Sequence, residues 1–393
     1  MITTINNKHN KLNVPNLRFK EFQGEWEYFL INDVCSEFKS GKNIKADSVF
    51  ECGEYPVYGG NGLRGYTSSY NHEGSYVLIG RQGALCGNVR SVYGKTYITE
   101  HAIAVAGNEK SNTNFLHYLF LKMNLGQYSD QSAQPGLAVN KLLKLKVALP
   151  IISEQTKIAK FLSLLDERIA TQSKIIDKLQ SLIKGMEDNL LDNPLWKKTY
   201  LRSFMQFFPT NSLSWEQLSY KEGAIRNLHY GLIHGLQTRG INSVSLPMIK
   251  NEAIPKQYTL CQVGDVAFAD ASEDTGEIAK SVEFVDTIEG DTICGLHTIH
   301  GRDIKNRTVV GFKGFAFNSR YFHNQIKRLA QGTKVFSITA NNLSSCYVYL
   351  PDLETQKAIV NLLKTYEAKL LVSKRLLEHY EKQKQYLLRQ MFI

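Results

Sequence analysis

Residues 139–169 read VNKLLKLKVALPIISEQTKIAKFLSLLDERI, and this stretch decides the fold because the chain uses its pattern twice. Residues 340–370, ANNLSSCYVYLPDLETQKAIVNLLKTYEAKL, align with it without a gap at an offset of 201 residues. A period this long exceeds that of solenoid repeats and indicates two domains, each followed by the same kind of helix. The residues identical in both copies are Asn140, Leu142, Val147, Leu149, Pro150, Gln155, Ile158 and Leu162, which recur as Asn341, Leu343, Val348, Leu350, Pro351, Gln356, Ile359 and Leu363.

Each copy opens a long helix that carries a seam of apolar residues at steps of three and four. This spacing is typical of coiled-coil packing. A polar residue interrupts both seams at the matching position, Gln172 in the first and Ser373 in the second, and Lys384 is a further break in the second seam. We predict that the two helices pair with each other antiparallel within one chain; the alternative is that each packs only on its own domain. The seam residues are Ile158, Leu162, Leu165, Ile169, Ile176, Leu179, Ile183 and Met186 in the first helix, and Ile359, Leu363, Tyr366, Leu370, Leu377, Tyr380 and Leu387 in the second.

The ends of these helices can be predicted from prolines and capping residues. Pro150 and Pro351 end the preceding strands, and Ser153 or Asp352 can cap the helix that follows. The sequence Asp192-Asn193-Pro194 predicts a break in the first helix. Pro194 suits a first helical position, so we expect the helix to restart through residues 195–208. A helix of about 38 residues is about 57 Å long.

The segments before the helices predict two mixed α/β domains with short strands and glycine-rich turns. A Trp-Glu pair opens each, at Trp26 and Trp215. The expected fold class is α+β, with two such domains joined by two long antiparallel helices in a pseudo-two-fold internal repeat. The expected divisions are an N-terminal arm at 1–17, a first domain at 18–150, a first helical region at 151–208, a second domain at 209–351 and a second helix at 352–393.

Charge and composition favour a polyanionic partner. The 393 residues carry a net charge of +10, which favours nucleic acid. Residues 265–291 oppose this trend, with nine acidic side chains against the single Lys280, and we expect them to face away from phosphate or to meet another protein. The first ten residues have no apolar leader, and no apolar run is long enough to cross a bilayer, so we expect a soluble, cytoplasmic protein.

Motifs for catalysis and for metal binding do not stand out. The sequence lacks the FxGxG and [DN]PP[YF] strings of adenine methyltransferases and the GxxxxGK[ST] phosphate loop. None of the six cysteines forms a CxxC pair, so we expect reduced thiols and no structural zinc. His297 and His300 are expected to point to opposite faces of a strand, with no cysteine completing a site. We therefore expect a protein that is not an enzyme.

The duplicated LPxxxxQxxI segments, each opening a long helix after a variable domain, resemble the specificity subunits of type I restriction–modification systems. Local strings are also similar to that family: YPVYGGNGLRGY at 55–66, YVLIGRQGALCGNV at 76–89, SAQPGLAVNKL at 132–142 and GDVAFADASEDTGEIAKSV at 264–282. The resemblance covers residues 14 to 393. One departure is the extra segment 192–208, which has no clear counterpart after the second helix.

The resemblance implies a division of labour. Two target-recognition domains each read one half of a split site in double-stranded DNA, and the paired helices set the spacing. Two modification (methyltransferase) subunits would carry the S-adenosylmethionine chemistry, and restriction (motor-nuclease) subunits would join for cleavage, while this chain holds no cofactor or metal. The alternatives are a self-contained DNA methyltransferase or nuclease with atypical motifs, and a coiled-coil adaptor that binds only protein.

Candidate DNA contacts are polar residues in predicted loops or at helix ends. Arginine suits guanine and Asn or Gln suits adenine in the major groove, whereas lysine and arginine bind phosphate. Each residue is also compatible with an ordinary solvated surface. The candidates are Lys39, Lys42, Asn61, Arg64, Arg81, Gln82, Gln131 and Gln134 in the first half, and Arg239, Arg320, Gln331, Thr333 and Lys334 in the second.

Overall fold

The structure is a computed structural model that describes residues 2–4, 13–130, 135–236, 239–241, 245–286, 288 and 290–393. The chain divides into two compact units. Unit 1 consists of Met1–Ser173 with Arg375–Ile393, and unit 2 of Lys174–Lys374. A membrane-spanning helix is absent from the described part of the chain.

Unit 1 is built around a six-stranded sheet in the order β4-β9-β7-β8-β5-β6, in which only the β5–β8 pair is parallel. Helix α2 packs on β7, β8 and β9, and its Phe115, Leu116 and Phe120 are fully buried. The elements are β1 (Ile2–Thr4), β2 (Leu17–Phe19), β3 (Glu27–Leu30), α1 (Ile31–Val34), β4 (Cys35–Ser40), η1 (Ala46–Ser48), β5 (Tyr55–Gly59), β6 (Gly62–Thr67), β7 (His72–Gly80), β8 (Val89–Ile98), β9 (Ala102–Gly107), α2 (Thr113–Met123), η2 (Leu125–Tyr128), α3 (Val139–Leu142) and β10 (Lys146–Leu149).

Unit 2 contains a five-stranded sheet, β12-β21-β17-β19-β15, and a four-stranded sheet, β13-β16-β14-β20. Two further strand pairs, β11–β23 and β18–β22, complete its β structure among the described residues. The elements are β11 (Lys197–Tyr200), η3 (Leu201–Ser203), β12 (Met205–Phe208), η4 (Trp215–Gln217), β13 (Leu218–Ser219), β14 (Ile225–Leu228), α5 (Tyr230–Gly235), β15 (Gly240–Ile241), β16 (Met248–Ile249), η6 (Asn251–Ala253), β17 (Val266–Ala269), β18 (Ala271–Ser272), β19 (Ser281–Phe284), β20 (Thr292–Cys294), β21 (Thr298–Asp303), α6 (Phe312–Ala316), α7 (Arg320–Leu329), β22 (Phe336–Ser337), α8 (Ala340–Ser345) and β23 (Tyr347–Leu350).

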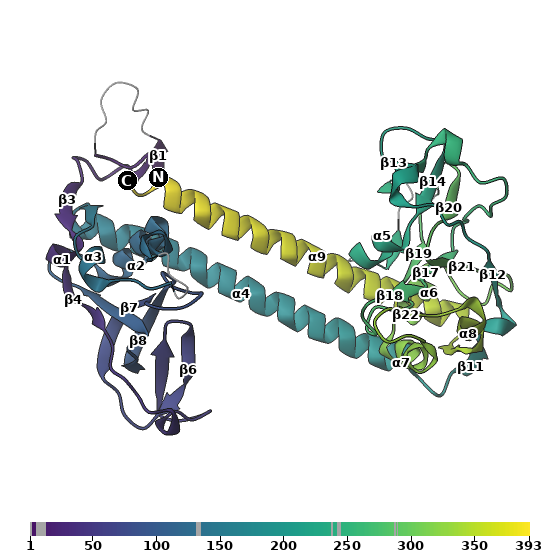
Figure 1. The fold of residues 1–393 in the computed structure, drawn as a ribbon, viewed down its shortest axis with the longest axis horizontal. Coiled ribbons are helices and arrows are strands. Elements are labelled where there is room, and N and C mark those ends of the chain that lie inside the picture. Colours follow the sequence, from purple (N-terminus) through teal and green to yellow (C-terminus); the bar gives the residue numbers. More distant parts are fainter. Residues whose placement is uncertain are drawn as a thin grey trace. The chain divides into compact units, whose positions relative to one another are not determined.

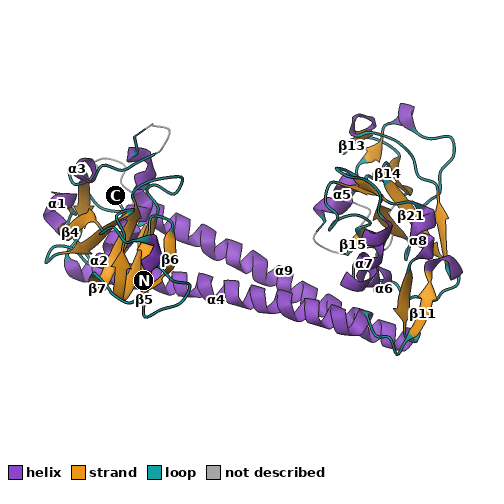
Figure 2. Ribbon diagram, turned by 60° about the horizontal axis from the view of Figure 1, so that its bottom comes forward, coloured by secondary structure: helices purple, strands orange, loops and turns teal. Residues whose placement is uncertain are grey.

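The two long helices, α4 (Ile152–Leu191) and α9 (Leu353–Gln390), pack together (Figures 1 and 2). In unit 1 the first turns of α4 share a core with the last turns of α9, where Leu162 and Leu387 are buried. In unit 2 the end of α4 shares a core with the start of α9, where Leu191 and Leu363 are buried. Pairing of opposite ends means that the helices run antiparallel. The predicted fold class, with two mixed domains and paired long helices, is confirmed.

Every predicted seam position is buried or half-buried. The polar break at Gln172 is also buried, at 8% exposure. In unit 1 the seam is flanked by an ion pair in which Lys384 Nζ of α9 lies 2.5 Å from Asp166 Oδ1 of α4. Apolar burial at this spacing is what binds one helix to the other.

The repeated glutamine makes the same three hydrogen bonds in each unit. Gln155 accepts the N–H of Asn112 and donates to the carbonyls of Lys110 and Pro150 at 2.8–2.9 Å. Gln356 accepts the N–H of Val309 and donates to the carbonyls of Arg307 and Pro351 at 2.9–3.0 Å. Both side chains are fully buried. A buried amide that satisfies otherwise unpaired backbone groups joins the start of each helix to the loop that leaves the central sheet.

The expected helical restart at residues 195–208 is wrong. This segment forms β11, a 3-10 turn and β12. β11 pairs antiparallel with β23, just as β3 pairs with β10 in unit 1. The strand just before each repeated proline needs a partner for its backbone groups, and this requirement prevails over the capping signal at Asn193 and Pro194.

Trp196, rather than Trp215, is therefore the structural counterpart of Trp26. Each of these two tryptophans precedes the strand that pairs with the proline-terminated strand. The backbone agrees, because Ile31 N–H donates to Leu145 O at 3.0 Å and Leu201 N–H donates to Cys346 O at 2.9 Å. The segment that looked like an addition to the first helix is the first part of the second repeat.

We predict that Gln356→Met destabilises unit 2. Methionine keeps the volume but leaves one N–H and two carbonyls without their partner, at a cost on the order of 3 kcal/mol. Urea unfolding followed by circular dichroism measures this change. Gln383→Met, at an exposed glutamine of the same helix, is the matched control and should leave the midpoint unchanged; equal midpoints for both variants would contradict the role assigned to Gln356.

Candidate nucleic-acid interface

Strand β7 of unit 1 ends in a loop whose backbone is held from two sides. Arg81 N–H donates to the carbonyl of His101, and Leu137 N–H donates to the carbonyl of Arg81, both at 2.9 Å. These bonds hold residues 81–83 beside the loop that precedes β9. The side chains of Arg81 and Gln82 are half-buried and exposed, respectively.

Strand β17 of unit 2 ends in the same backbone arrangement. Asp270 N–H donates to the carbonyl of His297, and Ile338 N–H donates to the carbonyl of Asp270, both at 3.0 Å. Asp270 therefore occupies the position that Arg81 occupies in unit 1, and Ala271 that of Gln82. The two units present different side chains from one shared backbone frame.

In unit 1 the predicted residues Asn61, Arg64 and Gln82 come together around one pocket of about 390 Å³. Gln82 Oε1 lies 3.2 Å from His101 Nδ1, which holds the glutamine at the pocket wall. Gly60 permits the close approach, because a Cβ there would lie 2.7 Å from the carbonyl of His101. The amides of Asn61 and Gln82 and the guanidinium of Arg64 thus line one hollow.

Two residues of this site were missed in the sequence. Arg90 of β8 lies beside the same turn, since a Cβ at Gly62 would meet its guanidinium at 3.0 Å, and it lines a neighbouring small pocket with Asn61. His101, which was not among the predicted contacts, also lines the pocket. Arg90 directly follows the GNV that ends the string at 76–89, which was the available signal.

The two lysines predicted near Gly41 differ in their surroundings. Lys39 is exposed and pairs with Glu37 at 3.3 Å. Lys42 is exposed, and its backbone N–H donates to the carbonyl of Ile98, which leads toward His101. Unlike Lys39, Lys42 forms no ion pair with the described residues, so its ammonium group is available to a ligand.

The corresponding surface of unit 2, at the end of β17, carries aromatic, histidine and acidic side chains. The imidazole of His229 lies between Trp215 and Tyr230, with ring centroids 4.4 and 4.8 Å away. Tyr230 also meets His297 at 5.2 Å, and His297 Nδ1 lies 3.1 Å from Asp270 Oδ1. Burial, with His297 nearby, lowers the pKa of His229, and burial raises the pKa of Asp270.

The acidic stretch 265–291 does not form one exposed patch. Asp265 is buried beside His300 and Arg302, and Glu283 is fully buried with its carboxylate 2.9 Å from Lys313 Nζ. Two of the nine carboxylates that the sequence suggested would face away from DNA are therefore neutralised inside unit 2.

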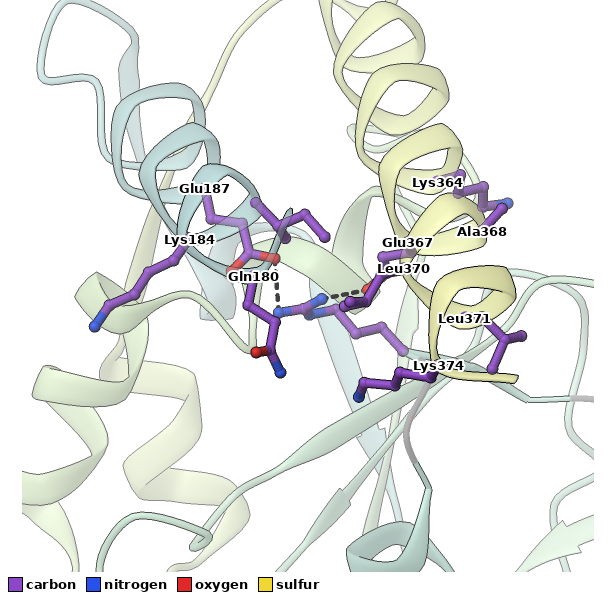
Figure 3. A pocket seen from close by; sticks show the side chains of 11 residues that line it. Gln180, Lys184, Glu187, Lys364, Glu367, Ala368, Leu370, Leu371 and Lys374 are labelled. Carbon is purple, nitrogen blue, oxygen red and sulfur yellow. Dashed lines mark hydrogen bonds and ion pairs between the residues drawn. The ribbon is translucent and has the colours of Figure 1, made fainter. Parts of the chain in front are cut away.

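Arg239 is engaged within the protein and is not retained as a DNA contact. Its guanidinium pairs with Glu187 of α4 at 2.7 Å and with Glu367 of α9, and it stacks on Phe315. Figure 3 shows the two carboxylates pointing toward one another across a cavity of about 570 Å³. Burial raises the pKa of both glutamates, and the arginine opposes this shift.

The remaining candidates of unit 2 lie at the surface. Arg320 is the exposed first residue of α7. Gln331 exchanges two backbone hydrogen bonds with Ser337, of 2.8 and 3.0 Å, and so closes a short loop on which Thr333 and Lys334 are exposed. Gln131 and Gln134, predicted for the matching loop of unit 1, lie outside the described residues.

Comparison with known proteins places both repeats in one family. Residues 23–181 and 291–381 match the family described as "Type I restriction modification DNA specificity domain". The EcoprrI specificity subunit of Escherichia coli is 42% identical over 154 residues, which are 38% of this chain and 38% of that protein. The MjaVIII specificity subunit of Methanocaldococcus jannaschii is 26% identical over 404 residues, covering 93% of each chain.

The fold has a solved counterpart as well. The S subunit of a type I restriction–modification system from M. genitalium aligns with 97% of this chain and 99% of its own, at a TM-score of 0.65 and 15% identity. That likeness concerns the fold. Because the family match falls on both repeats and covers most of the sequence, the chain belongs to the type I restriction–modification DNA specificity family.

Proposed function

We propose that this chain is the DNA-recognition subunit of a type I restriction–modification complex, in which each unit reads one half of a two-part site in double-stranded DNA. The observation that carries the proposal is the shared backbone frame at the ends of β7 and β17. It holds Arg81 in unit 1 and Asp270 in unit 2 with equivalent hydrogen bonds. One scaffold with two sets of polar side chains is what two different half-sites require.

The chemistry of the two edges fits different bases. Arginine donates two hydrogen bonds to guanine, whereas a carboxylate accepts from the amino group of cytosine. Unit 1 offers Arg64, Arg81 and Arg90 together with the amides of Asn61 and Gln82. Unit 2 offers Asp270 among aromatic and histidine side chains. The proposal therefore assigns base reading to these edges.

Phosphate contacts would supply affinity without sequence information. The net charge of +10 favours them. Lys42, Arg320 and Lys334 are exposed cations that we propose for this role. We place the chain in the cytoplasm, where such a complex meets DNA.

We further propose that the partners are two modification subunits, which hold S-adenosylmethionine, and restriction subunits that join for cleavage. Long helices with exposed apolar residues suit docking of such subunits. Ile175 and Leu182 on α4 are 41% and 45% exposed, and their spacing of seven residues puts them on one face of the helix. In this proposal the chain recognises the DNA site, and its partner subunits catalyse methylation and cleavage.

Arg64→Ala is expected to weaken discrimination at one half-site. The assay is fluorescence anisotropy on the complex with its modification partner, using the site found by methylome sequencing and versions with either half scrambled. Preference for the intact first half-site should fall about 5- to 150-fold, since a bidentate base contact contributes about 1–3 kcal/mol, while preference at the other half persists. Arg168→Ala, an exposed arginine on α4, is the control; unchanged discrimination in Arg64→Ala would argue against the unit 1 edge.

Lys42→Gln is expected to act differently. Loss of a phosphate contact weakens binding equally for all sequences and reduces the slope of log K against log salt by about one. Titrations at several salt concentrations measure that slope for wild type and variant. A sequence-dependent loss would instead make Lys42 a base contact, and an unchanged slope would remove it from the interface.

The purified chain alone is expected not to bind S-adenosylmethionine, and to gain that ligand only with its modification partner. Isothermal titration calorimetry of both samples tests this. Tight binding by the chain alone would favour a self-contained methyltransferase. DNA-binding titrations of the complex test the other alternative. If DNA binding shows neither a sequence preference nor a dependence on salt, the protein-only adaptor is favoured.

A further inference from the structure

Two thiols and an imidazole meet in the interior of unit 2. The Sγ atoms of Cys261 and Cys294 are 3.6 Å apart, and with a ring nitrogen of His300 they form a group whose donor atoms all lie within 4.8 Å of one another. All three residues are buried, with exposures of 7%, 3% and 1%. The expectation that no cysteine lies near His300 is wrong, because strand pairing brings together residues far apart in the sequence.

The cluster lies where two sheets of unit 2 meet. Cys294 ends β20 of the four-stranded sheet, and His300 lies in β21 of the five-stranded sheet. Cys261 is tied to β20 because its N–H donates to the carbonyl of Thr292 at 2.8 Å. In unit 1 the matching position of His300 is Ala104, since Ala102 and Thr298 occupy equivalent pairs with β7 and β17. The cluster is thus a feature of unit 2 alone.

A buried carboxylate orients the imidazole. Asp265 Oδ2 lies 2.7 Å from His300 Nε2, and Asp265 is itself held by Arg302 and by the N–H of Gln262 at 2.7–2.8 Å. Histidines that bind metals commonly donate their second ring N–H to a carboxylate in this way. We assign the Nε2 proton of His300 to the hydrogen bond with Asp265, which leaves Nδ1 for coordination in the site proposed below.

We propose that Cys261, Cys294 and His300 bind one thiophilic divalent cation of the zinc class, which joins the two sheets of unit 2. Two thiolates and one neutral imidazole are ligands that zinc prefers, and a tetrahedral ion with metal–sulfur bonds of about 2.3 Å separates its two sulfurs by about 3.8 Å. The observed separation of 3.6 Å is close to this value and far from the about 2.05 Å of a disulfide. Binding displaces the two thiol protons to solvent, and the dication then balances the two thiolates.

We assign the fourth position of the ion to a water molecule. Of the three ligands, Cys294 borders a pocket of about 270 Å³ that is also lined by Ile293, Asn211, Tyr258 and Thr259. In this proposal the ion enters from the side of Cys294. Three protein ligands and a water complete the tetrahedral set.

The test begins with the metal content of the full chain, purified without metal-affinity steps and analysed by inductively coupled plasma mass spectrometry. We expect about one equivalent of zinc in the wild type. Cys261→Ser and Cys294→Ser should each lose at least about 10-fold in zinc occupancy. Cys346→Ser removes another buried thiol of unit 2, 1% exposed and outside the cluster, and should keep its zinc.

Cobalt provides a readout that does not depend on the variants folding. The wild-type chain, stripped with a chelator and titrated with cobalt(II), should develop a sulfur-to-cobalt charge-transfer band and the strong visible bands of tetrahedral cobalt at one equivalent. Absence of zinc together with absence of these bands overturns the proposal. So does a Cys261–Cys294 disulfide in the native protein, detected by a mass two units lower than that of the reduced chain. DNA binding is measured separately, so the proposed function stands or fails on its own result.

Discussion

Burial of one amide at the start of each long helix is the interaction on which the arrangement depends. Gln155 and Gln356 each satisfy one backbone N–H and two carbonyls in the same geometry. An unpaired backbone group in the interior is costly, so the helix is held to the loop beside its sheet. Without that bond the apolar seam alone would bring the helices together but would not fix the angle at which each domain continues into its helix.

The shared backbone frame separates stability from specificity. Strand pairing and backbone hydrogen bonds hold the ends of β7 and β17 in equivalent places. These bonds do not depend on the side chain at position 81 or 270, so the side chain is free to differ. Under the proposed function, a few side-chain changes at these strand ends would alter the half-site that each unit reads while the core stays the same.

Unit 2 divides its strands between two larger sheets, and one of its parallel pairs, β14–β20, matches the parallel pair β5–β8 of unit 1. Both units bury ion pairs: Arg18 with Glu154 in unit 1, and Glu283 with Lys313 and Asp265 with His300 and Arg302 in unit 2. Buried ion pairs of this kind are costly to break once formed. The proposed metal ligands lie at the junction of the two sheets, and Ala104 of unit 1 occupies the position of His300.

The amino-acid sequence by itself determined the duplication, the two apolar seams and the family resemblance. These are patterns of residue spacing and identity within short stretches, and they can be recognised without knowledge of distant contacts. The sequence also singled out Asn61, Arg64 and Gln82 as candidates, since glycine-rich turns flanked by strands are visible locally, although Arg64 lies in strand β6 and not in the predicted loop. Only the tertiary structure decided that residues 197–200 are a strand, that Trp196 matches Trp26, and that Arg239 lies between two carboxylates. It also brought Cys261, Cys294 and His300 together. Each of these depends on a partner strand or helix tens to more than a hundred residues away, and no local propensity records which distant backbone or charge will arrive beside a given side chain.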